Sequence, residues 1–465
     1  MSSSTPQENP DTLWQRLRTT FAPQGIPTDD RGRMRMIVDS LILHIHPTKV
    51  EVRTLRFTYT WGLGGLSALL VMVLAFSGIL LEMNYTPSPT SAYQDILRLQ
   101  SDVWFGSLVR NLHHWSANLL IVVSVLHLLR VFLTGGHRAP RALNWLIGVA
   151  MLLLVVAANF TGYLLPWDQL AFWAITVGTS IIEYIPFIGS WISQLLLGGP
   201  AVGAPTLLNF YALHISIIPL GIVILMSYHF WRVRKDGGLT VPKAPGRQET
   251  PRPERVTTMP HLVRRELAWA LLWIAILLVW AMLVPAPLEE IANPDLSPNP
   301  AKAPWYFLGL QELLLHFHPV VGAVVIPGLA LGALALLPFL DLDLESVGVY
   351  FRSWRGRYLS LLSVGLALLL TPAWILLDEY LLDWAAWLPG WPSLLSNGLV
   401  PLSLVGLALF ALDEGLRRLF RTTVEERILI LFVFILAAFL VLTLTGIFFR
   451  GPGMALVWPW ELIAH

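Results

Sequence analysis

The chain has 465 residues, of which 55% are hydrophobic and only 13% are charged, and its formal net charge is +1. A soluble protein of this length would carry about a quarter charged residues, so most of this chain must lie in lipid. Cysteine is absent, which excludes disulfides, thioether-linked haem, iron–sulfur clusters and thiolate metal sites within the chain.

Nine segments are apolar enough to cross a membrane, because a spanning helix needs about 20 mainly apolar residues. They lie near residues 59–82, 107–133, 142–164, 207–231, 265–285, 320–340, 358–377, 393–412 and 426–449. Lys and Arg gather before the first span and in every second connection after it, and these residues favour the cytoplasmic side of short loops. This pattern predicts an odd number of spans, with the N-terminus cytoplasmic and the C-terminus outside.

Histidines interrupt two of these spans. The second carries His113, His114 and His127, and the fourth carries His214 and His229. Polar residues inside a span are costly and usually functional. Because a helix turns 100° per residue, residues 14 or 15 apart share a face and lie about 21–22 Å apart along the axis. His113 therefore shares a face with His127, as His214 does with His229, whereas His114 points away.

Both spans start outside, so they present two facing pairs at two depths. His113 and His214 lie near the outer leaflet, and His127 and His229 near the inner one. Each pair can fill both axial positions of a haem iron, and a six-coordinate haem transfers electrons rather than binding oxygen. Ordinary hydrogen-bonding histidines are the plainer alternative for a single residue, but two matched pairs favour haem.

Glycines and arginines accompany the histidines. Gly64 and Gly78 on the first span are 14 residues apart, as are Gly148 and Gly162 on the third. Small residues at this interval suit two haem planes stacked through one bundle, although close helix packing is the commoner reason for such glycines.

Arg110 and Arg130 each lie three residues from a ligand candidate. They can reach haem propionates through charge-assisted hydrogen bonds, and snorkelling to the membrane surface is the alternative.

The stretches VRNLHHWSANLLIVVSVLHLLRVFLTGG, TGYLLPWDQLAFWA and FYALHISIIPLGIVILMSYHFWRVRKDGG closely resemble cytochrome b of the bc1 and b6f complexes, most of all the b6 branch. The similarity covers residues 35–240 well and 255–375 more weakly. It implies an all-α integral membrane protein, with an N-terminal four-helix dihaem bundle followed by helices like those of subunit IV. Two non-covalent b haems would bind, the outer to His113 and His214 and the inner to His127 and His229.

The resemblance also implies a function. The chain would be the cytochrome b subunit of a quinol:cytochrome c oxidoreductase, or one with another high-potential acceptor, in a bacterial inner membrane. Quinol, expected to be menaquinol, would be oxidised outside with a Rieske iron–sulfur partner, and electrons would cross the membrane in a Q cycle that contributes to the proton gradient. A c-type cytochrome, membrane lipid and a homodimeric complex are the other implied partners, and no nucleic acid is expected.

The outer quinol site departs from the family pattern. The family carries Pro-Glu-Trp-Tyr where this chain has Ala303-Pro304-Trp305-Tyr306, so Pro304 replaces the glutamate thought to accept a quinol proton. By resemblance, Tyr163, Trp305 and Tyr306 line the pocket. Glu312, seven residues after Trp305 and expected on the same helical face, is our candidate for proton exit, with His316 and His318 as alternatives; an ordinary interfacial glutamate is an equal possibility.

Two further departures concern the inner side and the C-terminus. The b6 branch attaches an extra haem through a cysteine near the position of Gly62, so no covalent haem is expected here. Arg234, Lys235 and Asp236 follow His229 and could bind quinone or steer protons, but the excess of cytoplasmic basic residues also explains the first two.

We expect five parts: a cytoplasmic segment with a possible amphipathic helix in 11–46 (1–55), the haem-binding domain (56–234), a cytoplasmic linker (235–262), a subunit-IV-like domain with the quinol-site loop (263–380), and two extra spans with an outer tail (381–465). The extra spans could form an assembly face or face lipid. Two alternatives for the whole chain remain: a dihaem anchor of a dehydrogenase or hydrogenase, and a colourless proton-coupled transporter with histidine relays.

Overall fold

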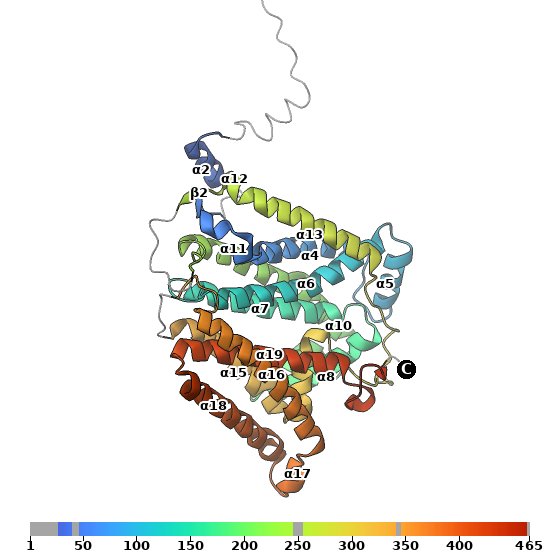
Figure 1. The fold of residues 1–465 in the computed structure, drawn as a ribbon. Coiled ribbons are helices and arrows are strands. Elements are labelled where there is room, and N and C mark those ends of the chain that lie inside the picture. The colour runs from blue at the N-terminus through green and yellow to red at the C-terminus, as the bar shows by residue number, and fades with distance from the viewer. Residues whose placement is uncertain (1–26, 40–45, 245–253, 341–345, 463–465) are drawn as a thin grey trace, which may run out of the picture.

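The structure is a computed structural model, and it describes residues 27–39, 46–244, 254–340 and 346–462. Within these ranges nine helical segments are long and apolar enough to cross a membrane, which confirms the predicted spans. They are α4 (Leu63–Glu82), α6 (Gly106–Leu133), α7 (Ala142–Tyr163), α10 with α11 (Ala204–Lys235), α13 (Val263–Leu283), α15 with its flanking turns (Val320–Phe339), α16 (Trp354–Tyr380), α18 with its first turn (Leu395–Phe420) and α19 (Val424–Phe448). Figure 1 shows these helices running side by side, with the shorter elements at their two ends.

Three of the spans widen into a π-helical turn immediately before a proline. The turns are Leu213–Ile217 before Pro219, Val320–Val325 before Pro327, and Leu395–Leu399 before Pro401. Proline lacks a backbone N–H and its ring collides with the carbonyl four residues earlier, so the preceding turn must adjust. The first of these turns, between α10 (Ala204–Ala212) and α11 (Ile218–Lys235), contains His214. π-Bulges often occur at functional sites, and this one contains a predicted metal ligand.

Short helices cover the end of the bundle where the second and fourth spans begin. They are α5 (Ala92–Ser101), α8 (Gln169–Ile182), α9 (Gly189–Leu197), α14 (Leu308–His316) and α17 (Trp384–Trp387), with helical turns at Trp305–Phe307 and Pro452–Met454. Asp168 caps α8 by accepting a hydrogen bond from the Ala171 amide, and its second oxygen accepts one from the Glu289 amide. This cap ties the loop after α7 to the segment that follows α13.

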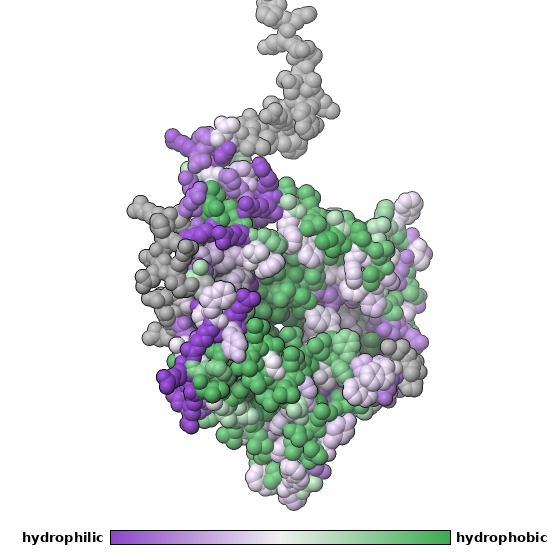
Figure 2. All heavy atoms as spheres, in the orientation of Figure 1, coloured by the Kyte–Doolittle hydropathy of each residue, from purple (hydrophilic) through white to green (hydrophobic). Residues whose placement is uncertain are grey.

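Polar elements gather at the opposite end of the bundle. Strand β1 (Lys49–Glu51) pairs antiparallel with β2 (Arg255–Thr257), beside α2 (Asp30–Asp39), α3 (Phe57–Thr60), α12 (Thr258–His261) and a turn at Val52–Leu55. This pairing joins the segment before the first span to the one after the fourth, so both lie at the same end, as the charge pattern predicts. Figure 2 shows hydrophilic side chains gathered there beside a broad hydrophobic surface. Of the predicted amphipathic helix, α2 is described, whereas residues 11–26 and 40–45 lie outside the described residues, as does 245–253 of the linker.

The two extra spans differ from each other. Helix α19 has half of its most apolar stretch buried in the molecule, compared with 17% for the α18 span. Leu429 and Val433 of α19 pack in one cluster with Phe132 and Trp145 of α6 and α7, and Ala437 packs with Ala367 of α16. Helix α19 therefore packs inside the bundle on one side, whereas Ile435 and Leu440 on it are exposed.

Candidate functional site

The four histidines lie in two facing pairs between α6 and the fourth span. The ring centroids of His113 and His214 are 6.2 Å apart, and those of His127 and His229 are 6.4 Å apart. An imidazole nitrogen lies about 1.2 Å from its ring centre and bonds a transition metal at about 2.0 Å, so two axial rings should have centroids about 6.4 Å apart. Both pairs therefore leave the space that one metal between two imidazoles requires.

Neighbouring groups orient the ring nitrogen that would face away from such a metal. Nδ1 of His214 lies 2.9 Å from the carbonyl oxygen of Ala158, and Nδ1 of His113 lies 2.9 Å from Oγ of Ser77. A carbonyl can only accept, so Nδ1 of His214 carries the proton and Nε2 keeps its lone pair. Metal-binding histidines are commonly held in this way.

Each predicted glycine lies against the imidazole of one of these histidines. A Cβ atom added at Gly162 would lie 2.5 Å from Cε1 of His214, and one at Gly64 would lie 3.1 Å from Cε1 of His127. The corresponding distances to Cε1 are 3.3 Å from Gly78 to His113 and 3.7 Å from Gly148 to His229. The first and third spans thus contact each histidine pair at its own level, and Gly162 is the glycine with the least space for a side chain.

The two predicted arginines have different surroundings. Arg110 donates to the carbonyl oxygens of Ala286 (2.8 Å) and Pro287 (2.6 Å), so in this structure it holds the segment after α13. Arg130 donates from Nε to the Tyr59 carbonyl oxygen, while its Nη2 is buried without a hydrogen-bond partner. Arg130 therefore retains a buried, unpartnered donor for an anionic group next to the His127–His229 pair, whereas both terminal nitrogens of Arg110 donate to backbone carbonyls.

The residues present fit two bis-imidazole haems, since each level offers two imidazoles at the right spacing with small residues beside them. No group of three or more His, Asp or Glu side chains able to hold a metal occurs within the described ranges. Coordination by two protein ligands per metal, with a macrocycle supplying the rest, agrees with that finding. His114 lies apart from both pairs, with Nε2 3.2 Å from the Asn118 amide nitrogen.

Aromatic side chains of the predicted outer pocket lie between α6, α7 and α14. Burial raises the pKa of Tyr306, with a smaller contribution from the nearby Tyr163, and the Tyr306 hydroxyl is buried without a partner. Trp305 turns the other way, donating from Nε1 to Oδ1 of Asn118 at 2.5 Å. Pro304 precedes the turn that carries both aromatic residues.

Glu312 lies in a buried cluster of charges rather than beside Trp305. It is fully buried and accepts hydrogen bonds from Arg450, with Nη2 to Oε1 at 2.6 Å. His316 contacts Glu312 at 3.3 Å through Nε2 and Asp378 at 2.7 Å through Nδ1. The expectation that Glu312 and Trp305 share one face is not met, because Trp305 meets α6 whereas Glu312 meets Arg450, just beyond α19.

The cluster fixes the protonation of its members. Burial alone would lower the pKa of His316, but hydrogen bonds to Asp378 and Glu312 outweigh it and raise that pKa to about 9. Burial alone would raise the pKa of Glu312, but His316 and Arg450 together lower it. At neutral pH the cluster therefore holds a carboxylate, an imidazolium and a guanidinium. His318 stands apart, with its ring 6.1 Å from that of Tyr184.

At the inner membrane edge, only one of the three predicted residues is buried. Asp236 is 8% exposed and pairs with Arg232 at 2.5 Å. Arg234 and Lys235 are exposed, and Lys235 lies 5.6 Å from the Trp231 ring. The structure thus groups Asp236 with Arg232, which sequence reasoning did not single out.

Sequence reasoning also missed Arg450 as the partner of Glu312. A signal was available, because Arg450 is a basic residue immediately after a span on the side where the loops are poor in Lys and Arg. A basic residue placed against the charge asymmetry of a membrane protein needs a local reason, and a buried acidic partner is one. Ser77 and Ala158, which orient two of the histidines, carry no such signal.

Comparison with known proteins agrees with this geometry. The family model described as Cytochrome b/b6/petB matches residues 50–237. A menaquinol:cytochrome c reductase cytochrome b subunit of Geobacillus thermodenitrificans is 42% identical over 180 residues, which is 38% of this chain and 80% of the relative. Cytochrome b6 of Prochlorococcus marinus (strain MIT 9515) is 40% identical over 175 residues, again 38% of this chain and 80% of the relative.

A solved structure extends the likeness of fold beyond the matched domain. A chain of a hyperthermophilic respiratory complex III aligns with a TM-score of 0.62 at 22% identity, covering 90% of this chain and 98% of that chain. At this identity the match concerns the arrangement of the helices alone.

Proposed function

This chain belongs to the cytochrome b family, and from that premise we propose that it is the cytochrome b subunit of a quinol:cytochrome c oxidoreductase. As a member of the family it binds haem b, and it is a multi-pass membrane protein. The finer parts of the proposal concern the number of haems, the quinone sites and the partners. We also propose that residues 56–234 are the haem-binding domain and 263–380 the subunit-IV-like domain.

We propose two non-covalent b haems, one on His113 and His214 and the other on His127 and His229. The observation that carries this is the pair of matching centroid separations, 6.2 and 6.4 Å, at two levels of one bundle. When bound, haem b supplies one-electron transfer. The histidines hold the two levels in line across the bilayer, and Arg130 offers its free Nη2 to a carboxylate at the inner level.

We propose that quinol, in the form of menaquinol, is oxidised at the outer pocket of Tyr163, Pro304, Trp305 and Tyr306. The unpaired Tyr306 hydroxyl supports this, because a buried donor without a partner suits a ligand oxygen. Arg110 and Asp168 position the segment between α13 and α14 by binding its backbone, as the bonds to Ala286, Pro287 and Glu289 indicate.

We propose that protons leave the outer pocket through Glu312 and His316. Because His316 and Arg450 keep the pKa of Glu312 low, a proton received by this carboxylate is passed on rather than retained. The His316 imidazolium gives its Nδ1 proton to Asp378, and the neutral ring then takes up the proton of Glu312. His316 bridges Glu312 to Asp378, whose side chain is 10% exposed and so lies closer to the surface. Replacing Glu312 by Gln should cut quinol oxidation sharply while both haem spectra remain, and unchanged turnover would remove Glu312 from the path.

The proposed partners are a Rieske iron–sulfur protein, a c-type cytochrome and a second copy of the complex. We place the protein in a bacterial inner membrane with its N-terminus in the cytoplasm, because the basic connections lie at that end. We further propose that Asp236 and Arg232, with Arg234 and Lys235 beside them, lie at an inner quinone site where the electrons return to quinone.

The test is a measurement of haem content and activity on the purified complex. We expect two b haems per chain by the pyridine haemochrome assay, and quinol-dependent reduction of a c-type cytochrome with a Rieske protein present. A colourless chain would refute the haem proposal and favour a transporter. Two haems without a Rieske partner or quinol oxidation would instead favour a dihaem anchor.

A further inference from the structure

Two loops dock against each other at the end of the bundle that carries α2 and the β1–β2 pair. The loop after α6 and the turn before α16 are joined by backbone hydrogen bonds from Gly348 to the Thr134 carbonyl (2.9 Å) and from Phe351 to the Leu133 carbonyl (3.1 Å). Arg352 and His137 lie in these loops, beyond the ends of the membrane-spanning helices.

Arg352 is a buried cation that has no anionic partner among the described residues. The residue is 7% exposed, and the Nε, Nη1 and Nη2 atoms of its guanidinium all lack a hydrogen-bond partner. Its one contact of note is with the Phe132 ring, whose centroid lies 5.8 Å from the guanidinium carbon. Removing a charge from water without pairing it costs several kcal/mol, so such a side chain is expected to meet an anion in the working protein.

His137 adds a second unused polar group beside the same ring. It is fully buried, neither ring nitrogen has a partner, and its ring stacks 5.4 Å from that of Phe132. Burial, with a contribution from Arg138, lowers the pKa of His137 to about 3. The imidazole is therefore neutral at physiological pH and offers one N–H donor without adding charge.

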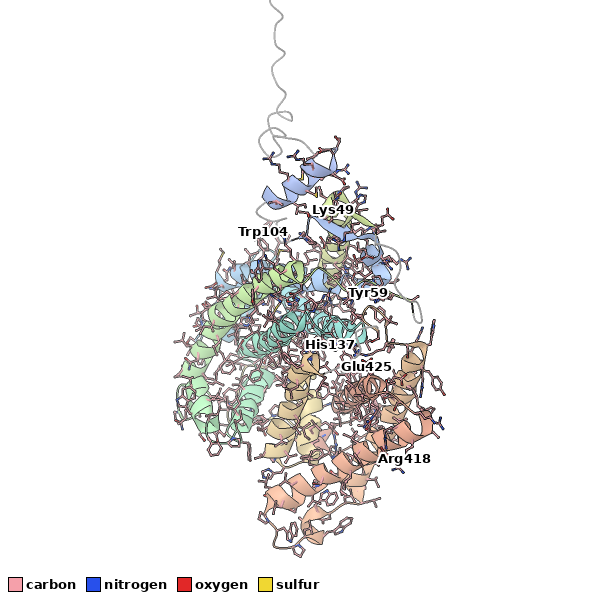
Figure 3. The ribbon with its side chains drawn as sticks, turned by 90° about the vertical axis from the view of Figure 1, so that its left-hand side faces the viewer. Lys49, Tyr59, Trp104, His137, Arg418 and Glu425 are labelled. Carbon is pink, nitrogen blue, oxygen red and sulfur yellow. The ribbon has the colours of Figure 1, made fainter. Side chains whose placement is uncertain are left out.

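One carboxylate of the described residues, Glu425, contacts other side chains of these two loops. Glu425 lies 3.5 Å from Nη2 of Arg138 and also accepts a hydrogen bond from Ser346. Figure 3, which looks onto this end of the bundle, labels both His137 and Glu425. Among the described residues, no carboxylate forms a hydrogen bond or an ion pair with Arg352, so its charge remains to be balanced by another group.

We propose that Arg352 and His137 bind a phosphate group, and that an anionic phospholipid supplies it. A guanidinium presents a planar fork of donors that matches two phosphate oxygens, and the imidazole N–H can donate to a third. The site lies beside the end of α6 and the beginnings of α7 and α19, at the level expected of lipid headgroups, and anionic lipids are enriched at the cytoplasmic surface. Bound there, the lipid would tie the loop after α6, a haem-bearing helix, to the turn before α16.

The test uses the full-length protein, purified in detergent and stripped of lipid, with thermal unfolding as the readout. Phosphatidylglycerol should raise the unfolding temperature of the wild type by several degrees more than phosphatidylcholine does, and Arg352→Gln should abolish that difference. The matched control is Arg357→Gln, which removes the same charge from an exposed position five residues away and should keep the full response. An equal response of Arg352→Gln and wild type would overturn the site.

Two further arms keep the proposal testable. Inorganic phosphate at the same concentration should stabilise the wild type far less than the lipid, and equal stabilisation would keep the phosphate site but reject lipid as its source. If Arg352→Gln fails to fold, Arg352→Lys retains the charge but loses the fork, so it should need about tenfold more phosphatidylglycerol for the same effect. No change in that requirement would contradict bidentate binding.

Discussion

Replacing Arg450 by Gln tests whether the ion pair with Glu312 holds the C-terminal half together. Arg450 is 1% exposed, and besides three hydrogen bonds to Glu312 it donates to Glu379 and to the Met454 carbonyl, at 3.1 and 2.8 Å. The variant would leave the Glu312 carboxylate buried with only His316 as a charged partner, at 3.3 Å. Breaking one side of a buried ion pair costs about 3–5 kcal/mol, and we expect a loss of stability of that size.

Denaturant titration of the purified protein in detergent, followed by tryptophan fluorescence, measures this loss. Trp384 donates to Asp378 of the same cluster and gives a local signal. Arg417→Gln is the matched control, because Arg417 pairs with Glu414 on an exposed surface and its replacement should leave stability nearly unchanged. A double variant with Glu312→Gln should lose much less than the sum of the two single changes. A loss below about 1 kcal/mol for Arg450→Gln, or simple additivity, would refute a tightly coupled buried pair.

Three other outcomes are expected. Gly162→Ala should perturb the outer b-haem absorption, because its Cβ would lie 2.5 Å from Cε1 of His214. Gly148→Ala is the control and should leave the inner haem absorption unchanged, because its Cβ would lie 3.7 Å from Cε1 of His229. Equal spectra for the two variants would contradict the prediction that Gly162 is the more crowded position. His214→Ala should remove one of two b-type signals in the reduced-minus-oxidised spectrum, and the account of the outer site fails if both remain. Folding raises the pKa of His316 from 6.5 to about 9, so the charged imidazole stabilises the folded protein. This stabilisation is complete below pH 6.5 and is lost as the pH rises through 9. The free energy of unfolding of the wild type should therefore fall across that pH range, and that of His316→Gln should change much less.

The sequence alone determined the number and positions of the spans, and its charge pattern predicts their orientation. Hydropathy over about 20 residues is a local property, and the alternation of basic loops follows directly from chain order. The levels of His113, His127, His214 and His229 also follow from helix rise alone, since α6 and the fourth span enter the membrane from the same side. The facing pairs of the structure have the separations that these levels require.

Only the tertiary structure decided which side chains meet. Arg450 and Glu312 are 138 residues apart, and nothing in their local sequence names them as partners. Arg110 has the spacing of a propionate ligand, yet it binds the carbonyl oxygens of Ala286 and Pro287, because α13 ends beside it. Trp305 and Glu312 do not lie on one helical face, because Trp305 belongs to a 3-10 turn before α14 rather than to the α-helix itself.

The physical reason is the range of the interactions. A span forms because its own residues leave water, so its sequence suffices to locate it. The neighbours of a side chain depend on the rotation of each helix about its axis and on how the helices pack, and these are set by contacts between distant segments. The sequence therefore predicted which metal-ligating residues lie at each level of the bundle. The residues that orient the histidines and pair with the buried charges could be identified only from the packed helices.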